Sequence, residues 1–187
     1  PSISGKARVG SLLTATSTTW QPAPVNLAYE WFRSGTTAPI PGATSATYRL
    51  TGDDYGKTVR VRVTGSKPGY ETVAKSSKST ARIASASLSP TPAPVIDNTK
   101  PAVDQLLTAS AEWGPAPVGL THQWYKVSKK GKSYRLSGAT SATYRVRSSD
   151  VGYRLKVRVT GRKTGYASKS TYSKTTAYVK KATFSTV

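Results

Sequence analysis

The residues Val-Arg-Val-Arg-Val-Thr-Gly at positions 59–65 alternate apolar and basic side chains, and Leu-Lys-Val-Arg-Val-Thr-Gly at positions 155–161 repeats the alternation. A period of two places alternate side chains on opposite faces of a β-strand. We therefore expect Val61 to point into a hydrophobic core and Arg62 to point toward solvent. No stretch of the chain shows a helical period with capping residues, so the sequence predicts an all-β fold.

These two strands belong to a repeat that covers almost the whole chain. Trp-Gln-Pro-Ala-Pro-Val at positions 20–25 returns as Trp-Gly-Pro-Ala-Pro-Val at 113–118, and the eight residues at 42–49 return unchanged at 138–145. A period of this length is long enough for each copy to enclose its own hydrophobic core. Features shared by both copies therefore report mainly on the fold, and differences between them point to function.

The repeat predicts the domain boundaries. We expect a first domain over residues 1–84, a linker rich in proline and serine over 85–94, and a second domain over 95–187. The tail from about residue 181, which includes Phe184 and Ser185, resembles the linker. This resemblance predicts a further repeat in a longer parent protein.

Turn residues separate the other expected strands. The Tyr-x-Trp strand at 29–31 is followed by the strand around Tyr48, and we expect closing strands at 81–83 and 177–179. The second copy has a basic insertion at 129–132, which predicts a hairpin tip. Short strands at regular spacing, separated by glycine, proline, aspartate and serine, are typical of an antiparallel sandwich.

The charge of the chain indicates the class of its partner. The 187 residues include 28 lysines and arginines and 8 aspartates and glutamates, for a net charge of +20. Residues 1–84 contain 11 bases and 4 acids (+7), and residues 85–187 contain 17 bases and 4 acids (+13). A protein this basic is attracted to polyanions such as nucleic acids, anionic wall polymers and acidic polysaccharides. The alternative is that the charge provides solubility alone.

The sequence offers few groups for catalysis. His122 is the only histidine, and it lies on the same strand face as Trp124. Of the acids, Asp53 and Asp54 are adjacent, but they lie in a turn where aspartate caps backbone amides. No cluster of carboxylates or cysteines predicts a metal site, and no apolar run is long enough for a membrane span. We expect a protein that is not an enzyme, has no cofactor and does not insert into a membrane.

The first copy contains Thr-Trp-x-Pro-x-Pro at 19–24, Tyr-x-Trp at 29–31 and Gly-Tyr at 69–70. Together these motifs resemble the immunoglobulin-like repeats of secreted and surface proteins of actinobacteria. The resemblance implies two tandem immunoglobulin-like β-sandwich domains with Trp31 and Trp124 in their cores. Because the chain contains no cysteine, these domains have no disulfides. Such repeats accompany wall-active enzymes or adhesins, which implies catalytic or adhesive domains in the same parent chain.

The candidate ligand-binding site is the outward face of the central sheet. If Trp31 points inward in the first copy, Phe32 points outward beside Arg60 and Arg62 of the neighbouring strand, with Glu30 as the one countercharge. Aromatic rings together with fixed positive charges suit a sugar ring that bears a phosphate or carboxylate. The alternative is an ordinary solvated strand face with cross-strand pairs of aromatic and basic residues.

The second copy presents a more basic version of this face. Glutamine replaces the acidic residue, and the candidate residues are Tyr125, Lys156, Arg158, Tyr178 and Lys174. We predict a non-catalytic module, a monomer, of a secreted or surface-exposed bacterial protein that attaches to an anionic cell-wall polymer or polysaccharide. Spacer repeats without a specific ligand are the alternative, and nucleic-acid binding is a third hypothesis, for which no motif is visible.

Overall fold

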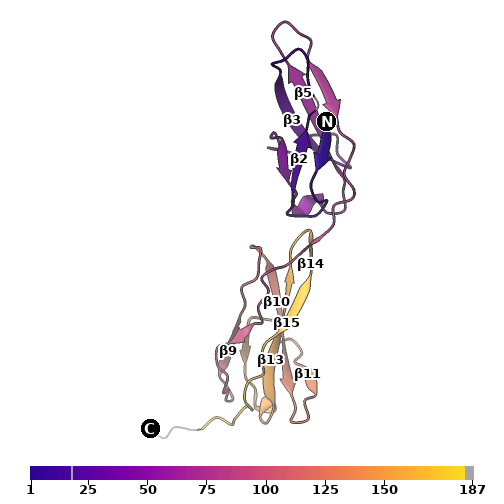
Figure 1. Ribbon diagram of the computed structural model, residues 1–187. Coiled ribbons are helices and arrows are strands. Elements are labelled where there is room, and N and C mark those ends of the chain that lie inside the picture. Colours follow the sequence, from indigo (N-terminus) through magenta and orange to yellow (C-terminus); the bar gives the residue numbers. More distant parts are fainter. Residues whose placement is uncertain (18, 184–187) are drawn as a thin grey trace. The chain divides into compact units, whose positions relative to one another are not determined.

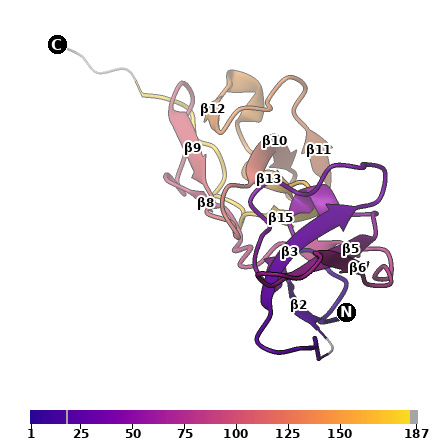
Figure 2. The same ribbon diagram turned by 90° about the horizontal axis from the view of Figure 1, so that it is seen from above.

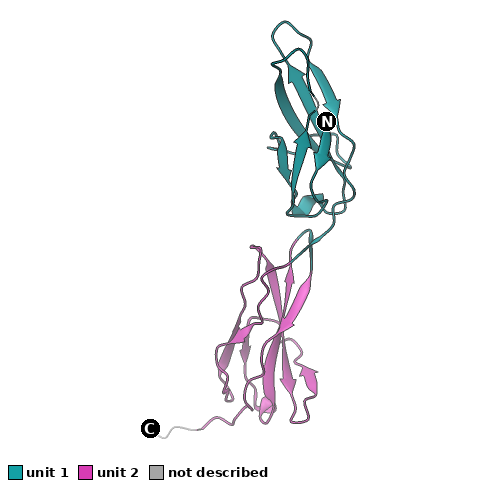
Figure 3. Cartoon of the chain, in the orientation of Figure 1, with its two compact units in different colours: residues 1–87, 164–167 teal, residues 88–163, 168–187 magenta. Residues whose placement is uncertain are grey.

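The computed structural model describes residues 1–17 and 19–183, which form β-strands joined by loops and two short 3-10 helices (Figure 1). The chain divides into two compact units (Figure 3). The first unit contains residues 1–87 and 164–167, and the second contains residues 88–163 and 168–187. Within the described ranges, no helix is long and apolar enough to cross a membrane.

The first unit contains two antiparallel sheets of three strands. One sheet has the strand order β1 (Ser2–Ser4), β2 (Leu12–Thr16), β4 (Thr47–Arg49). The other sheet has the order β3 (Asn26–Arg33), β5 (Val59–Ser66), β6 (Val73–Ser76), and these three strands are labelled together in Figure 2. The 3-10 helix η1 (Gly52–Asp54) leads into β5. Two further strands assigned to this unit pair in parallel: β7 (Ala86–Ser87) and β14 (Tyr166–Ala167).

The second unit repeats this arrangement with one additional strand. Its smaller sheet has the order β12 (Thr143–Arg145), β9 (Leu106–Ser110), β8 (Val95–Ile96). The larger sheet has the order β11 (Ser133–Arg135), β10 (Gly119–Val127), β13 (Arg154–Arg162), β15 (Lys169–Tyr172). The helix η2 (Ser148–Asp150) corresponds to η1. The basic insertion forms the tip of the β10–β11 hairpin, where the Ser128 amide donates to the Lys132 carbonyl at 2.9 Å.

The core of each unit lies where the alternating pattern places it. The Val61 and Val157 side chains are fully buried, as are Trp31 and Trp124. Each tryptophan stacks on a tyrosine of the opposite sheet, with ring centroids 5.6 Å apart in the first unit and 5.5 Å apart in the second. Both units are immunoglobulin-like β-sandwiches, and the chain has no cysteine from which a disulfide could form.

The expected closing strands at 81–83 and 177–179 are not regular strands, and this part of the prediction is wrong. The regular edge strands are β6 and β15, which come earlier in the chain. After them, side-chain hydroxyls replace backbone carbonyls as acceptors for the central strand, and the Val61 amide donates to Ser77 Oγ at 3.1 Å. A hydroxyl accepts from a backbone amide in the same way at three further pairs: Val59–Thr80, Val157–Ser173 and Leu155–Thr176.

Part of the segment predicted as a linker contacts the second unit. The Ser89 amide donates to the Gly114 carbonyl at 2.8 Å, and the Trp113 indole donates to the Pro92 carbonyl at 3.0 Å. The Trp113 ring is 6% exposed, so this segment contributes to covering it. The domain boundaries expected at 84–85 and 94–95 stay a prediction.

Candidate functional site

The central strand β13 of the second unit presents a row of three cations on its outer side. Leu155 and Val157 point into the core, so the alternate residues Arg154, Lys156 and Arg158 point outward and are half-buried. The row follows from the strand period alone, because residues two positions apart share one face. It brings three positive charges into line along one strand.

Aromatic rings from both sides of β13 contact this row. The Arg158 guanidinium lies 6.0 Å from the ring centre of Tyr125 on β10, and the Lys156 ammonium lies 4.8 Å from that of Tyr172 on β15. The Arg154 guanidinium lies 5.6 Å from the ring centre of Tyr178. We call this surface the basic–aromatic face and define it by six residues: Tyr125, Arg154, Lys156, Arg158, Tyr172 and Tyr178.

The basic–aromatic face has no acidic partner among the described residues. None of its three cations takes part in an ion pair there, and the Nε atoms of Arg154 and Arg158 are buried without a hydrogen-bond partner. Cation–π contacts balance only part of a positive charge, and they leave guanidinium donors free to bind an oxyanion. The face therefore retains both charge and hydrogen-bonding capacity.

Gln123, which stands where the first unit has its acid, is not an exposed part of this face. Its side chain is 4% exposed, and its amide donates to the backbone carbonyls of Trp124 and Leu136 at 3.0 and 2.8 Å. The Gln123 oxygen accepts from Arg135 Nε at 2.7 Å. The expected outward position is wrong, because the Gln123 amide turns to the backbone carbonyls of Trp124 and of Leu136, which follows β11.

On the corresponding surface of the first unit, the aromatic ring is covered and the cations have partners. Phe32 lies on the outer side of β3 as expected, but it is only 4% exposed. The guanidinium groups of Arg60 and Arg62 cover its ring, at 4.4 and 5.2 Å from the ring centre. Arg62 also pairs with Glu30 at 2.7 Å, and Arg60 donates to Ser76 Oγ at 3.2 Å. The expectation of an aromatic ring open to a ligand is therefore wrong for Phe32.

The structure separates two of the predicted second-unit residues from the centre of the face. Tyr178 was expected beside Arg158, but it contacts Arg154 instead. Lys174 instead lines a shallow hollow of about 410 Å³ together with Pro94 and Val95. Sequence reasoning missed Tyr172, which lies opposite Arg158 in the β13–β15 register and is 46% exposed. The signal that could have found Tyr172 is its replacement of Ser76 between the copies.

A second group of rings and lysines lies around the hairpin at the end of β10. Lys126 lies 4.7 Å from the ring centre of Tyr153, which meets Tyr134 edge to face at 6.3 Å. Lys126 also lies 3.8 Å from the buried carboxylate of Asp150. This acid offsets the positive charge, and the group differs in that respect from the basic–aromatic face.

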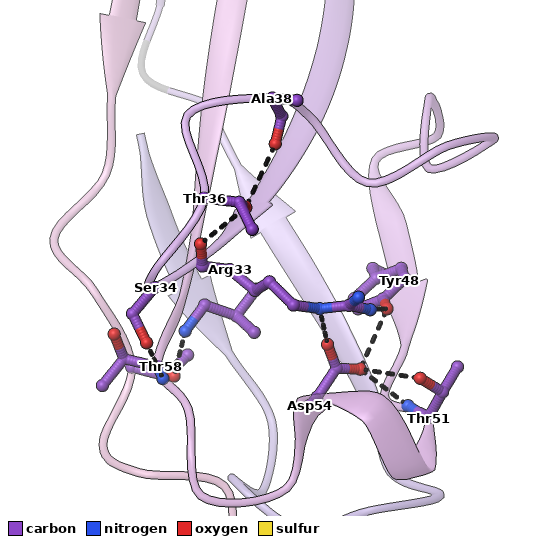
Figure 4. Close-up of polar contacts among 10 residues, drawn as sticks. Arg33, Ser34, Thr36, Ala38, Tyr48, Thr51, Asp54 and Thr58 are labelled. Atoms are coloured by element: carbon purple, nitrogen blue, oxygen red, sulfur yellow. Dashed lines mark hydrogen bonds and ion pairs between the residues drawn. The ribbon is translucent and has the colours of Figure 1, made fainter.

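The buried aspartates stabilise the units and are not candidates for catalysis. In the first unit, Asp54 accepts hydrogen bonds from Arg33 Nε at 2.8 Å, the Tyr48 hydroxyl at 2.9 Å and the Thr51 amide at 2.7 Å (Figure 4). Burial opposes the charge of Arg33, but its hydrogen bonds to Tyr48 and Asp54 outweigh burial and raise the pKa of the guanidinium. Burial and the bond to Asp54 raise the pKa of the Tyr48 hydroxyl.

The remaining candidates for chemistry are isolated. His122 lies opposite Val159 in the β10–β13 register, and burial lowers the pKa of its imidazole. Within the part of the chain that the structure describes, no three histidine, aspartate or glutamate side chains come together as metal ligands would. The basic–aromatic face is therefore the strongest candidate for a functional site.

No protein-family model matches the chain, and no curated protein matches its sequence. Among solved structures, the chain is similar to the N-terminal four Ig domains of Dscam1 isoform 6.9, with 14% identity and a TM-score of 0.38. That match covers 94% of this chain and 42% of the Dscam1 chain, so this chain spans less than half of that structure. The chain is also similar to the tandem Ig repeats of Dlar, with 19% identity, a TM-score of 0.23, and coverage of 85% and 84% of the two chains. The description of the fold rests on the strand order and cores given above.

Proposed function

We propose that the chain is a non-catalytic binding module that attaches a secreted bacterial protein to an anionic cell-wall polymer or polysaccharide. The observation that carries the proposal is the row of three cations on β13, which lacks an acidic partner among the described residues. The actinobacterial surface location, the further domains in the parent chain and the monomeric state are parts of the same proposal.

Binding proceeds in two physical steps. The net charge of +20 attracts a polyanion over a distance set by salt screening. At contact, guanidinium and ammonium groups pair with the anionic groups, while the C–H faces of sugar rings pack on the exposed tyrosines, of which Tyr172 and Tyr178 are 46% and 41% exposed. Retention should therefore fall steeply as salt rises.

The difference between the two units supports a role beyond scaffolding. The position of the acid Glu30 holds a neutral amide in the second unit, the position of the covered Phe32 ring holds the half-buried Tyr125, and the exposed Tyr172 stands where the first unit has Ser76. Two copies under the same structural constraint would keep equivalent surfaces if both were only spacers. The alternative function, spacer repeats of an adhesin or secreted enzyme, is favoured by the matching tryptophan–tyrosine cores of the two units.

A retention experiment with purified bacterial walls separates these functions. The double variant Lys156→Ala/Arg158→Ala removes two charges from the face, and Lys129→Ala/Lys130→Ala removes two charges from the exposed hairpin tip as a matched control. At about 1 kcal/mol per cation, the first variant should bind about 30-fold more weakly, and the control should change binding by less than about 3-fold. Equal losses in both variants, or no retention of the unmodified chain at low salt, would refute the proposal.

A gain of binding in the first unit provides a second test. Glu30→Gln removes the acid that pairs with Arg62 at 2.7 Å and makes this position resemble the second unit. We expect wall retention to extend to a higher salt concentration in this variant. The outward-facing Glu71→Gln change controls for net charge, and an equal effect of both variants would show that position on the face is unimportant.

A further inference from the structure

We infer that the basic–aromatic face binds a single extended polyol phosphate chain in which six backbone bonds separate successive phosphates, and that this chain lies parallel to β13. The inference rests on the proposed function and names the class of ligand. Its basis is the spacing of the cations and the position of the rings on both sides of them.

The cations leave the strand at a defined spacing. Residues two apart on a strand are separated by about 6.6–6.8 Å, so the Cα atoms of Arg154, Lys156 and Arg158 span about 13–14 Å. A polypeptide has three backbone bonds per residue and spans about 3.3–3.6 Å per residue when extended. A polymer with six backbone bonds per charge therefore has nearly the same repeat, about 7 Å. A polyol phosphate built on a three-carbon unit has this property, and so does a single-stranded nucleic acid, from which the rings distinguish it.

The width of this surface suits one chain. Tyr125 belongs to the strand on one side of β13 and Tyr172 to the strand on the other side, and their rings meet across β13 with centroids 5.9 Å apart, so a polymer passes over the rings. Because neighbouring strands lie about 4.8 Å apart, the surface that the three strands present is about 10 Å wide. A single polymer chain fits this width, and a double helix could contact the flat surface with only one of its strands.

The charges favour an oxyanion over a neutral sugar as the group at each position. None of the three cations takes part in an ion pair among the described residues. A guanidinium binds phosphate with two parallel hydrogen bonds from its planar fork. The Nε atoms of Arg154 and Arg158 are buried, so each arginine binds through its terminal Nη groups, and Lys156 between them pairs with the middle phosphate.

The tyrosines favour a polyol or sugar chain over single-stranded nucleic acid. Tyr125 and Tyr172 contact each other at 5.9 Å with 59° between their planes, and each also contacts a cation. Bases that stack in succession need open ring faces. Tilted rings that are already in contact provide less of this surface, whereas the smaller C–H groups of a polyol can pack at their edges.

A series of defined oligomers tests the inference on the full chain. Synthetic 1,3-linked glycerol phosphate oligomers with two, three, four, six and ten phosphates are titrated at low salt, and binding is measured by calorimetry. We expect affinity to rise at least 3-fold per phosphate up to three or four, and to rise less than 2-fold from four to ten. Inorganic tripolyphosphate, whose phosphorus atoms are separated by only two bonds, should bind at least 10-fold more weakly than the three-phosphate oligomer.

The variants separate a failure of this inference from a failure of the proposed function. Lys156→Ala should lower the affinity for the three-phosphate oligomer at least 5-fold, and Lys130→Ala should lower it less than 2-fold. Suppose that Lys156→Ala weakens binding as expected. The face then binds polyanions, but the inferred ligand class is wrong if any of three results is found: affinity shows no plateau with oligomer length, tripolyphosphate binds as tightly as the three-phosphate oligomer, or oligothymidylate binds more tightly than that oligomer. If both variants behave alike, or no oligomer binds, the proposed function fails together with the inference.

Discussion

The substitution Asp54→Asn is expected to destabilise the first unit much more than Asp150→Asn destabilises the second. One carboxylate oxygen of Asp54 accepts from Arg33 Nε at 2.8 Å, and the Asp54 side chain is fully buried. Asparagine removes the charge that pairs with the guanidinium. Breaking a buried ion pair from one side costs about 3–5 kcal/mol, and because the Arg33 side chain is 18% exposed we expect the lower end, about 3 kcal/mol.

The second unit has a weaker arrangement at the same place. Asp150 Oδ1 has no hydrogen-bond partner among the residues that the structure describes, and Lys126 Nζ lies 3.8 Å from it. The other oxygen accepts from the Tyr144 hydroxyl at 2.6 Å and from the Arg147 amide at 3.0 Å, and the amide oxygen of asparagine can accept both bonds. The expected loss is therefore about 1 kcal/mol.

Amide hydrogen exchange measured by mass spectrometry on the full chain distinguishes the two units, because β5 and β13 give different peptides. A loss of about 3 kcal/mol should speed exchange in β5 about 150-fold, and a loss of about 1 kcal/mol should speed exchange in β13 about 5-fold. Equal acceleration in both strands, or a loss below about 1 kcal/mol in β5, would refute the reasoning about the Arg33 ion pair.

Three other predictions concern packing and pH. Gly161→Ala should destabilise the second unit by about 2 kcal/mol, because a Cβ there would clash with Trp113 Cε3, and an unchanged melting temperature would contradict this close contact. Burial lowers the pKa of His122. Its contribution to stability is therefore complete above the unfolded value of about 6.5 and is lost as pH falls through the folded pKa. A His122 titration midpoint, measured by NMR, at or above that of a histidine peptide would contradict this prediction. Burial and a hydrogen bond to aspartate raise the pKa of Tyr48 and of Tyr144, so stability should fall as pH rises from about 10 through their folded pKa values, and ultraviolet titration should show two of the 11 tyrosines ionising last rather than all together.

The period of two was enough to predict the central strands and the cores. Val59, Val61 and Val63 are all fully buried, and Trp31 lies in the core as the Tyr-x-Trp spacing indicated. These residues were predictable because the strand period alone decides which sheet face a side chain occupies. The turn position of Asp54 was also predictable, because aspartate often caps backbone amides in turns. Its carboxylate accepts from the Thr51 amide in the structure.

The sequence was less informative about what covers each outward side chain. Long arginine side chains cover Phe32, and Gln123 is buried because its amide donates to the Leu136 carbonyl and its oxygen accepts from Arg135. Tyr172 was missed because the closing strand was expected at 177–179, whereas β15 ends at Tyr172. Cover of this kind depends on distant segments, which a local pattern does not encode.

The hydroxyl groups of Ser77, Thr80, Ser173 and Thr176 have a consequence for a chain that contains two copies of one domain. They hold the last segment of each unit on its sheet while ending the regular ladder. Two related copies on one chain are at high local concentration, and free strand edges favour pairing between them. We expect these four small side chains to oppose such pairing.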